Sequence, residues 1–516
     1  MNSPGGSCSV MKFGGTSVDN INEIATIVGF EAKKAQPIMV VSAYSGQTDV
    51  LKSITQNILQ NPSLWSYQSL YFALEPVLDY AMKKAGEQCP GHSFTVLSSI
   101  YQYLVECINE VIREILSILD VLPAKDSSHI TPEFRTYIED RIIGLGEVFS
   151  AHILAKVLST RTELARVFED VSLVDIFNAD PQSSPVLPDQ KDAFFEEASQ
   201  KIAAKIQAVL DRGNVPVVTG YMGYLPGGIL KTIDRGYTDS TAALTAVALL
   251  HMGIDPEHIR LQIWKEVPGL MTADPRIVEP NYNSKTQRRA GDFKVAKVRS
   301  HASFTEAAEL ADLGGMKAIN PNGIWILDGK GIELQVRSTF DPESSGTIIT
   351  ESEDLNERGI RFISGKGGQM MYRVKSNKMV EQNGVAAKIF NACAELGISV
   401  DAITTSGTTV SFSMSANHER KVELEERLSR IGSFELCENM ALVCCIGNSM
   451  RYMKGLLREL SGILSDNDIN IEFDCGDPDN NVTFVVNEAD FKKAIKSLHQ
   501  GVIEKIPVVA DQGADI

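Results

Sequence analysis

Short apolar runs alternate with glycine-containing turns and amphipathic helical patterns at the start of the chain. Residues 10–13 form an apolar run that leads into a turn at 14–17, and from about residue 20 apolar side chains recur with the roughly 3.6-residue period of a helix. Residues 38–43 repeat the strand pattern, and a turn at 45–49 precedes a second amphipathic helix. Two strand–helix units in succession favour a parallel sheet with ligands at the carboxyl ends of its strands.

The middle of the chain changes to an almost wholly helical pattern and then returns to strands. From about residue 62 to residue 156 the apolar positions predict helices, which we interpret as a helical lobe. A polar stretch at 338–358, rich in Ser, Glu and Asp, predicts a linker and a domain boundary near residue 350. Between the helical lobe and the predicted linker, the pattern predicts strands at 215–219, 259–264 and 324–327, and helices at 240–252 and 304–313.

The last third of the chain contains an internal repeat. Gly384 opens a helical pattern that is followed by a strand at 410–414. About 71 residues on, Gly455 opens a second helical pattern, which is followed by a strand at 482–486. Each copy then ends in a polar amphipathic helix. We interpret the repeat as a ferredoxin-like unit of the ββαβ type that is present twice.

Composition and charge exclude several classes of protein. The 516 residues predict about three domains, and 43% apolar residues suffice to give each a core. A net charge of −17 disfavours binding to nucleic acid or to anionic lipid. The N-terminus lacks the pattern of a signal peptide, and no stretch reaches about 18 apolar residues. We therefore expect a soluble, cytoplasmic protein with neither nucleic acid nor membrane as a partner.

The cysteines and histidines predict no metal site. The eight cysteines are scattered, without a C-x-x-C pair, and no paired histidine spacing accompanies them. This usage is typical of a reducing compartment, so we expect neither a disulfide scaffold nor a zinc site.

The turn after the first strand has the composition of a phosphate-binding loop. Gly14 and Gly15 allow backbone N–H groups to approach an anion, the following helix N-terminus favours negative charge, and Lys12 supplies a cation. The lysine precedes the glycines, so the Walker A spacing is absent. Taken alone, the segment could equally be a tight turn beside a surface lysine.

Five motifs, in order along the chain, carry a resemblance to a known family. They are KFGGTSV at 12–18, VVSAYSGQTD at 40–49, GLGEVFSA at 144–151, DRGYTDSTAA at 234–243 and WKEVPGLMTADPR at 264–276. With them the chain resembles the aspartate kinases of the amino-acid kinase family, most closely their fungal-type members. The repeat resembles the pair of ACT domains that these enzymes carry.

The resemblance implies an α/β amino-acid kinase fold, with a central, mostly parallel sheet between helical layers and a helical lobe, followed by two ferredoxin-like α+β ACT domains. The implied boundaries are 1–345 for the catalytic domain, with its helical lobe at about 60–156, then 346–360 for a linker, 361–436 for the first ACT domain and 437–516 for the second.

The implied reaction transfers the γ-phosphoryl group of ATP, with Mg²⁺, to the β-carboxylate of L-aspartate and gives 4-phospho-L-aspartate. This product feeds the synthesis of lysine, threonine, methionine and isoleucine. A carboxylate is already ionised at neutral pH, so the acceptor requires no general base. The site instead has to hold two anions in line and neutralise the charge on the transferred group.

The resemblance implies three groups of site residues. The residues at the transferring phosphoryl group would be Lys12, Asp239 and Lys317. Those that bind aspartate would be Ser42, Thr48, Glu147 and Arg235. Those that bind the nucleotide would be Gly14, Gly15, Lys265, Glu266, Met271 and Arg276.

Particular roles follow from the same resemblance. Arg235 would clamp the substrate carboxylate with two parallel hydrogen bonds, which lysine cannot make. Asp239 would orient lysines and help to hold aspartate, and Glu147 would lie near the substrate amine. Two of these residues have simpler alternatives, because Glu147 could be an acid on a helix surface and Thr48 a turn residue.

The chain departs from the family pattern at several positions. Tyr237 and Thr238 stand where most of the family has Gly-Ser, so the substrate contacts can differ. Met271 replaces a common aromatic residue, and Asn320 replaces the histidine of a His-Pro pair. None of these changes removes a principal charged group.

The ACT resemblance implies an amino-acid effector, usually lysine or threonine, and a homodimer or higher homo-oligomer. The implied effector pocket consists of Asn383, Gly384, Asp401, Thr405 and Ser406. Gly407 stands where lysine-sensitive members often have Glu, which favours threonine or the absence of strong feedback. Alternatively, both repeats serve only dimerisation by covering an exposed sheet edge.

A basic stretch at 285–299, with Asp292 as its one acid, has two interpretations: it steers MgATP to an acidic protein, or it is a solvated loop. Two rival functions also remain. One is a different amino-acid kinase, such as glutamate 5-kinase; the other is a catalytically inactive sensor that retains the ACT pair. The presence of Lys12, Glu147, Arg235 and Asp239 argues against the inactive sensor.

Overall fold

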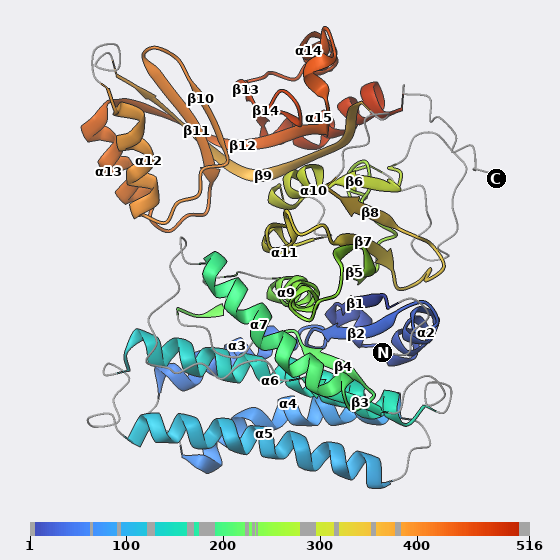
Figure 1. Ribbon diagram of the computed structural model, residues 1–516. Helices are drawn as coiled ribbons and strands as arrows, with labels where there is room; N and C mark the ends of the chain where they lie inside the picture. Colours follow the sequence, from blue (N-terminus) through green and yellow to red (C-terminus); the bar gives the residue numbers. More distant parts are fainter. Residues whose placement is uncertain are drawn as a thin grey trace, which may run out of the picture. The chain divides into compact units, whose positions relative to one another are not determined.

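The computed structural model describes most of the chain and divides it into two compact units. The described residues are 6–61, 66–89, 94–120, 130–161, 170–174, 191–221, 227–229, 233, 236–278, 296–313, 319–351, 358–376 and 383–504. Residues 1–269 and 318–351 form the first unit, and residues 270–317 and 352–516 form the second. Each unit has its own sheet (Figure 1).

The first unit contains a mostly parallel sheet whose strands run in the order β3-β4-β2-β1-β5-β7-β8. Only the β7–β8 pair among these is antiparallel. The strands are β1 (Cys8–Phe13), β2 (Gln36–Val41), β3 (Asp170–Val174), β4 (Asn214–Thr219), β5 (Ile259–Lys265), β7 (Glu333–Ser338) and β8 (Thr347–Thr350). Every residue of β1 is buried, as expected for a central parallel strand covered on both faces. The predicted parallel sheet is confirmed.

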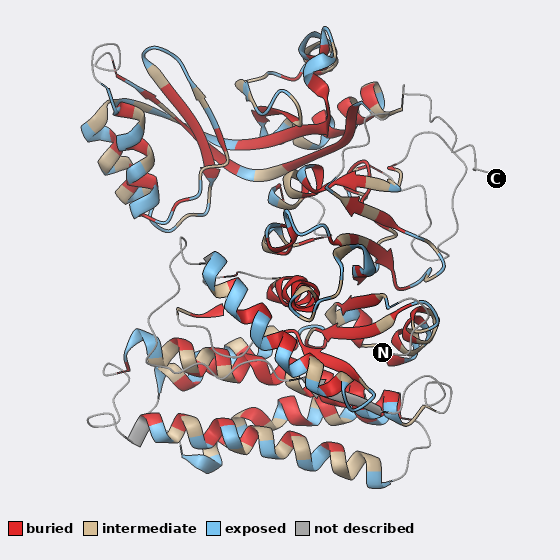
Figure 2. Ribbon diagram, in the orientation of Figure 1, coloured by how far each residue is buried: buried red, intermediate tan, exposed pale blue. Residues whose placement is uncertain are grey.

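Helices accompany this sheet, and the predicted helical lobe is confirmed. They are α1 (Gly15–Val18), α2 (Ile21–Glu31), α3 (Gln47–Gln60), α4 (Tyr67–Gln88), α5 (Phe94–Asp120), α6 (Pro132–Ser159), α7 (Lys191–Leu210), α9 (Tyr237–His251), the short η5 (Pro256–His258) and α11 (Pro321–Leu327). The helix α9 is buried along almost its whole length (Figure 2). The lobe consists of α4, α5 and α6, and α4 and α5 alternate buried and exposed positions as amphipathic helices do.

Within the described part of the chain, α6 is the one helix long and apolar enough to cross a membrane. Of its most apolar stretch, 83% is buried inside the structure. A buried apolar helix of this kind is typical of a protein core.

Two sequence predictions need correction in this unit. Residues 324–327, predicted as a strand, belong to the helix α11. The Asn320 side chain accepts a hydrogen bond from the Asn322 amide at 2.9 Å, and Pro321 occupies the first helical position, so the segment begins as a capped helix. A four-residue apolar run does not distinguish the two structures by itself. The stretch predicted as a linker contains β8, which pairs with β7.

The second unit contains one antiparallel sheet that the two repeats build together. Its strand order is β10-β11-β9-β12-β14-β13. The strands are β9 (Gly359–Lys375), β10 (Ala402–Thr405), β11 (Thr409–Ser415), β12 (Ser433–Asn448), β13 (Phe473–Cys475) and β14 (Asn481–Asn487). The helical segments are α12 (Val385–Glu395), α13 (Lys421–Ile431), η7 (Met450–Tyr452), α14 (Leu456–Asp466), η8 (Glu488–Asp490), α15 (Phe491–Leu498) and η9 (His499–Ile503).

The internal repeat is confirmed, but the order of its elements is βαββα rather than ββαβ. The matching residues Gly384 and Gly455 cap α12 and α14 with φ angles of 85° and 84°. Because only glycine adopts this left-handed conformation without steric cost, the same residue recurs at the same point of each copy. The first strands of the two copies, β9 and β12, pair with each other and make the sheet continuous.

A segment before residue 318 packs with the repeats. It contains β6 (His301–Ser303) and α10 (Phe304–Asp312). The Ile363 amide of β9 donates to the Thr272 carbonyl at 2.8 Å, and buried Arg361 pairs with Glu306 at 3.2 Å. The contacts therefore group residues 270–317 with the repeats, whereas the predicted catalytic domain extends to residue 345.

Candidate active site

The candidate site lies where four neighbouring strands of the first unit end. Lys12 lies opposite Val40 of β2 and Ile263 of β5, so the three strands reach their carboxyl ends together. β4 is in register with β2 there, since Thr219 lies opposite Val41. The order of the strands reverses at β1, with β2 on one side and β5 on the other. Ligands of open α/β sheets bind at such a point.

Two lysines flank one buried carboxylate at this edge. The Lys12 Nζ lies 2.6 Å from Asp239 Oδ1, and the Lys265 Nζ lies 3.8 Å from Asp239 Oδ2. Lys12 comes from β1, Lys265 ends β5, and Asp239 is in the first turn of α9. Three separate elements thus supply a cluster that carries one net positive charge.

Electrostatics keeps Asp239 ionised. Burial would raise its pKa, but the attraction of Lys12 and Lys265 outweighs burial, and the pKa lies below its ordinary value. Burial also lowers the pKa of Lys265, and the nearby Lys12 acts in the same direction. An anionic ligand beside the two ammonium groups would relieve their mutual repulsion.

The glycine turn brings main-chain donors next to this cluster. A Cβ added to Gly14 would lie 3.9 Å from the Lys12 Nζ. A Cβ added to Gly15 would lie 2.7 Å from the Ala43 carbonyl oxygen, so only glycine allows the turn to lie this close to the segment after β2. α1 begins at Gly15, and the first amides of a helix have no partners within it. The arrangement can bind the oxygens of a phosphate.

A second cluster surrounds the fully buried Glu147 of α6. Its Oε1 accepts hydrogen bonds from the hydroxyls of Thr238 at 3.0 Å and Ser42 at 3.3 Å. Its Oε2 has no hydrogen-bond partner within the described residues. Burial raises the pKa of Glu147 to about 7, although Thr238, the Ala43 amide and the charge of Lys12 oppose the rise. An acceptor this deeply buried is suited to an ammonium group.

Two glycines in the GLGE motif allow α6 to pack closely enough to bring Glu147 to the site. A Cβ on Gly144 would lie 3.2 Å from the Tyr221 ring, and one on Gly146 would lie 3.0 Å from Leu51 and 3.1 Å from Ala43. Larger side chains would move the helix outward. Glu147 is therefore buried and is not an acid on a helix surface.

Sequence reasoning missed Gly220 altogether and treated Thr238 only as a departure. A Cβ on Gly220 would lie 2.4 Å from Thr238 Cγ2 and 2.6 Å from Glu147 Oε2. Gly220 directly follows β4, so its place at the carboxyl end of a predicted strand was the available signal. Thr238 contacts both Ser42 and Glu147, which are distant in sequence.

The other predicted site residues are placed as follows. Ser42 follows β2, and Thr48 lies in the first turn of α3. Glu266 follows Lys265 and is exposed. Met271 and Arg276 belong to the second unit, where Arg276 pairs with Asp274 at 2.6 Å. Arg235, Lys317 and most of the basic stretch lie outside the described residues.

The predicted effector residues occupy the loops around α12 and β10. Asn383 and Gly384 precede α12, Asp401 precedes β10, and Thr405 and Ser406 follow at the end of β10. The Asp401 carboxylate accepts a hydrogen bond from the Lys366 ammonium at 2.8 Å. The predicted effector residues thus lie at both ends of β10 and at the start of α12, all within the first repeat.

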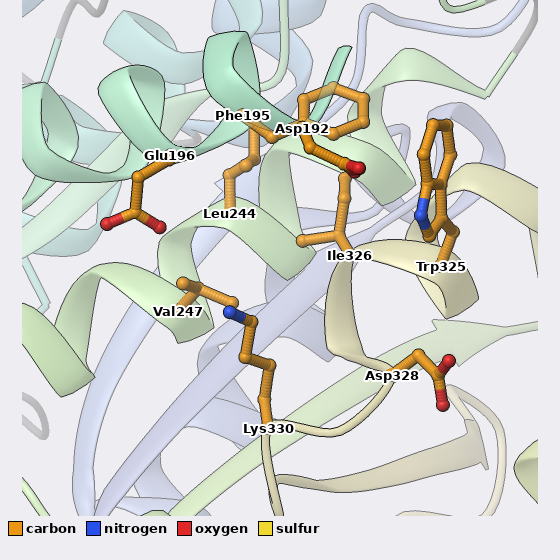
Figure 3. A pocket seen from close by; sticks show the side chains of 9 residues that line it. All are labelled: Asp192, Phe195, Glu196, Leu244, Val247, Trp325, Ile326, Asp328 and Lys330. Carbon is orange, nitrogen blue, oxygen red and sulfur yellow. The ribbon is translucent and has the colours of Figure 1, made fainter. Parts of the chain in front are cut away.

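A separate cavity of about 400 Å³ lies between α7, α9 and α11 (Figure 3). Trp325 and Phe195 meet there edge to face, with ring centroids 5.7 Å apart. The carboxylates of Glu196 and Asp328 point away from one another. Its charged groups do not converge on a common point, in contrast to the Lys12 cluster.

Comparisons with known proteins agree with this geometry. Residues 7–338 match the model of the amino acid kinase family, and residues 374–422 and 443–502 match an ACT domain. The chain belongs to the amino acid kinase family. It is 28% identical to an aspartokinase of Candida albicans, over 98% of this chain and 92% of that protein. It is 26% identical to the lysine-sensitive aspartokinase 3 of Escherichia coli, over 96% of this chain and 99% of that protein.

A solved structure shows the same fold over almost the whole chain. The crystal structure of E. coli aspartokinase III in complex with aspartate and ADP superimposes with a TM-score of 0.69 at 24% identity. The match covers 96% of this chain and 100% of the E. coli chain. The fold expected from the motifs, an amino-acid kinase domain followed by an ACT pair, is confirmed.

Proposed function

We propose that this protein is an aspartate kinase that transfers the γ-phosphoryl group of ATP to the β-carboxylate of L-aspartate. The observation that carries the proposal is the pair of clusters at one sheet edge. The first cluster presents the ammonium groups of Lys12 and Lys265 beside a glycine turn. The second presents the buried Glu147 carboxylate, one oxygen of which accepts hydrogen bonds from two hydroxyls. The first suits a phosphoryl group and the second an amino acid. The names of the relatives, aspartokinases from a fungus and a bacterium, support this choice of acceptor.

The chemistry follows from the charges. Lys12 and Lys265 neutralise charge on the phosphoryl oxygens during transfer, and the Gly14–Gly15 turn donates N–H groups to them. Asp239 stays ionised between the lysines and holds their ammonium groups in place. The β-carboxylate of aspartate attacks without a general base because it is already ionised.

Binding of the acceptor uses the second cluster. The unpartnered Glu147 Oε2 accepts the substrate ammonium, and Ser42 and Thr238 hold the other oxygen of Glu147. Thr48 and Arg235 are proposed to contact the substrate as well. Magnesium enters as MgATP, because it is usually held by substrate phosphates and a few carboxylates rather than by an all-protein cage.

One assay tests the proposal. The purified protein is incubated with MgATP and either aspartate or glutamate, and ADP formation is measured. We expect turnover with aspartate and little with glutamate. Turnover with glutamate alone would assign the chain to a different acceptor, and no turnover with either would favour an inactive ACT sensor.

We also propose that the ACT pair binds a free amino acid that inhibits the kinase. One relative is named as lysine-sensitive, and the residues that match an ACT domain include Gly384 and Asp401 of the predicted pocket, which supports the proposal. Gly407 supplies no carboxylate for a lysine ammonium, which favours threonine. Added threonine should therefore lower the rate of the aspartate reaction, and stronger inhibition by lysine would contradict the argument from Gly407.

A further inference from the structure

One face of α6 contacts the segment that joins β4 to α9. Spacings of three and four residues place four residues of α6 on this face: Thr136, Asp140, Gly144 and Glu147. Residues 220–236 form the β4–α9 connection, of which the structure describes residues 220, 221, 227–229, 233 and 236. Because the connection begins after β4 and ends at α9, both of its ends lie at the candidate site.

Asp140 is a buried carboxyl group that binds the connection at two points. Its Oδ1 accepts a hydrogen bond from the Tyr221 hydroxyl at 2.5 Å, and its Oδ2 accepts one from the Ile229 amide at 3.2 Å. The side chain needs such donors, because Asp140 is 2% exposed and the burial of a carboxyl group without hydrogen bonds is unfavourable. Asp140 thus fixes two separate parts of the connection to α6.

Close packing surrounds this pair of hydrogen bonds. The Tyr221 ring lies over Gly144, where an added Cβ would be 3.2 Å away, and a Cβ on Gly228 would lie 2.9 Å from Thr136 Cγ2. The Tyr221 ring also packs edge to face against the Tyr237 ring, with centroids 4.8 Å apart and planes at 76°. The connection therefore lies against α6 on both sides of Asp140.

The first anchored residue, Tyr221, is next to the acceptor cluster. It directly follows Gly220, and a Cβ on Gly220 would lie 2.4 Å from Thr238 Cγ2 and 2.6 Å from Glu147 Oε2. The Thr241 hydroxyl of α9 donates to the Gly220 carbonyl at 2.5 Å. A shift of Tyr221 away from α6 would therefore move Gly220, and with it the start of α9, relative to Glu147.

The second anchored residue, Ile229, is linked to the end of the connection. Its carbonyl accepts a hydrogen bond from the Ile233 amide at 2.8 Å, and the Ile233 carbonyl accepts one from the Asn322 side chain of α11 at 2.7 Å. Ile233 comes shortly before Arg235, which is proposed to contact the substrate. The contacts that start at Asp140 thus reach the part of the chain that leads into α9.

We propose that Asp140 is a positioning residue for the acceptor amino acid: by binding Tyr221 and Ile229 it keeps the β4–α9 connection against α6, so that Gly220 and Thr238 keep their places around Glu147. The inference rests on the proposed function. Asp140 acts through these residues and transfers no group.

The phosphoryl cluster has its own support. Asp239 pairs with Lys12 of β1 at 2.6 Å, a contact that involves neither α6 nor the connection. Loss of Asp140 should therefore weaken aspartate binding more than it slows phosphoryl transfer.

The test compares wild type with Asp140→Ala and Tyr221→Phe. We expect KM for aspartate to rise about tenfold in Asp140→Ala and about three- to fivefold in Tyr221→Phe, with kcat and KM for ATP changed less than about twofold. The double variant should have the KM of Asp140→Ala, because the hydrogen bond that Tyr221→Phe removes is already lost. Partial unfolding would lower the apparent kcat and leave KM unchanged, so KM separates positioning from stability.

Asp140→Asn is the conservative variant. It keeps an oxygen that can accept both hydrogen bonds, since Oδ1 lies 2.5 Å from the Tyr221 hydroxyl and 3.3 Å from the Ile229 nitrogen. It should restore KM for aspartate to within about threefold of wild type.

Tyr137→Phe is the matched control. It removes another hydroxyl of α6 that donates to a carboxylate, that of Glu114 at 3.1 Å, away from the connection. It should leave KM for aspartate unchanged, and an equal rise in Tyr137→Phe and Tyr221→Phe would contradict the proposal.

Two outcomes separate this inference from the proposed function. If wild type is active on aspartate and Tyr221→Phe keeps the wild-type KM, the positioning role is wrong, whether or not Asp140→Ala folds. If wild type is inactive on aspartate, the proposed function itself fails.

Discussion

At the scale of single residues, the site depends on where charge is paired and where it is left open. Asp239 is paired with a lysine on each oxygen, whereas Glu147 has one oxygen held by hydroxyls and one that meets no partner among the residues that the structure describes. Two carboxyl groups at one edge of the sheet thus have opposite pKa shifts, because Asp239 has two cations beside it and burial dominates at Glu147.

The raised pKa of Glu147 predicts the pH dependence of aspartate binding. With a pKa of about 7, Glu147 is ionised above that pH and becomes protonated below it. A protonated carboxyl cannot pair with the substrate ammonium, so kcat/KM for aspartate should fall about tenfold per pH unit below pH 7. Steady-state kinetics between about pH 5.5 and about pH 8.5 measure this fall in kcat/KM.

The variant Glu147→Gln tests whether Glu147 causes the fall of kcat/KM for aspartate below pH 7. The variant should bind aspartate weakly at every pH, and its kcat/KM should lose the pH dependence near 7. An unchanged limb in Glu147→Gln would show that another group is responsible for it.

Short motifs predicted these residues only in part. Lys12, Glu147 and Asp239 stand in the recognised motifs, and the structure brings Lys12 and Asp239 into direct contact. Ser42 and Glu147 were predicted to bind the same substrate, but the hydrogen bonds that Ser42 and Thr238 make with Glu147 were not, because Ser42 and Thr238 are 196 positions apart in sequence and meet only through the fold. Local pattern carries no information on such a contact.

At the scale of elements, close approach between strands and helices is as important as the charges. Gly220 after β4 has no room for a side chain between Thr238 and Glu147. Gly220→Ala should therefore displace one of these groups, destabilise the protein by about 2 kcal/mol and raise KM for aspartate. Chemical denaturation and steady-state kinetics measure the two effects.

Gly86→Ala in α4 is the matched control. A Cβ there meets no atom within 4 Å, and alanine favours the helix by roughly 0.5–1 kcal/mol. It should keep the activity and slightly raise stability. Equal effects of the two substitutions would contradict the packing argument.

The second unit contains a hydrogen bond to a buried histidine. Thr272 and His499 of η9 share a hydrogen bond of 2.9 Å, and His499 is 1% exposed. Burial, with a contribution from Lys297, lowers the pKa of His499 to about 4. The unfolded chain binds a proton near pH 6.5, so between these values the unfolded state binds more protons and stability falls as the pH falls.

This linkage predicts a measurable loss of stability on acidification. At pH 5 the contribution of His499 should be lower than at pH 7 by at most about 2 kcal/mol. His499→Gln should reduce the change in the unfolding midpoint between these pH values, whereas His258→Gln, at an exposed position, should leave it as in wild type. The same slope in all three proteins would contradict the assignment.

Element types followed from periodicity where the pattern was long, and failed where it was short. The helices α6 and α9 were expected from extended apolar patterns and are present. The strand predicted at 324–327 was wrong, because four apolar residues fit the period of a helix as well as that of a strand. The N-cap at Asn320 favours the helix. The repeat itself was recognisable from the sequence. The order of its elements, βαββα, was not, because each copy begins with a strand, β9 or β12, that was not predicted and that pairs with the first strand of the other copy.

At the scale of the whole molecule, the chain combines an amino acid kinase domain, built on the parallel sheet, with a pair of ACT repeats, built on the antiparallel sheet. Both assignments follow from the fold and the family matches. The net charge of −17 is compatible with a phosphate site because Lys12 and Lys265 are gathered at one edge, where a local field outweighs the average. Composition alone could not have located them.

Capture of the acyl phosphate by hydroxylamine tests most directly whether the protein phosphorylates the β-carboxylate of aspartate at the Lys12 cluster. Wild type with MgATP, aspartate and hydroxylamine should give aspartyl hydroxamate, and Lys12→Met should lower its rate by about 100-fold or more because one cation at the phosphoryl group is lost. Lys83→Met, an exposed lysine of α4, should behave as wild type. Hydroxamate formation by Lys12→Met at the wild-type rate would exclude a role of Lys12 in phosphoryl transfer, and no hydroxamate from wild type would exclude aspartate kinase activity.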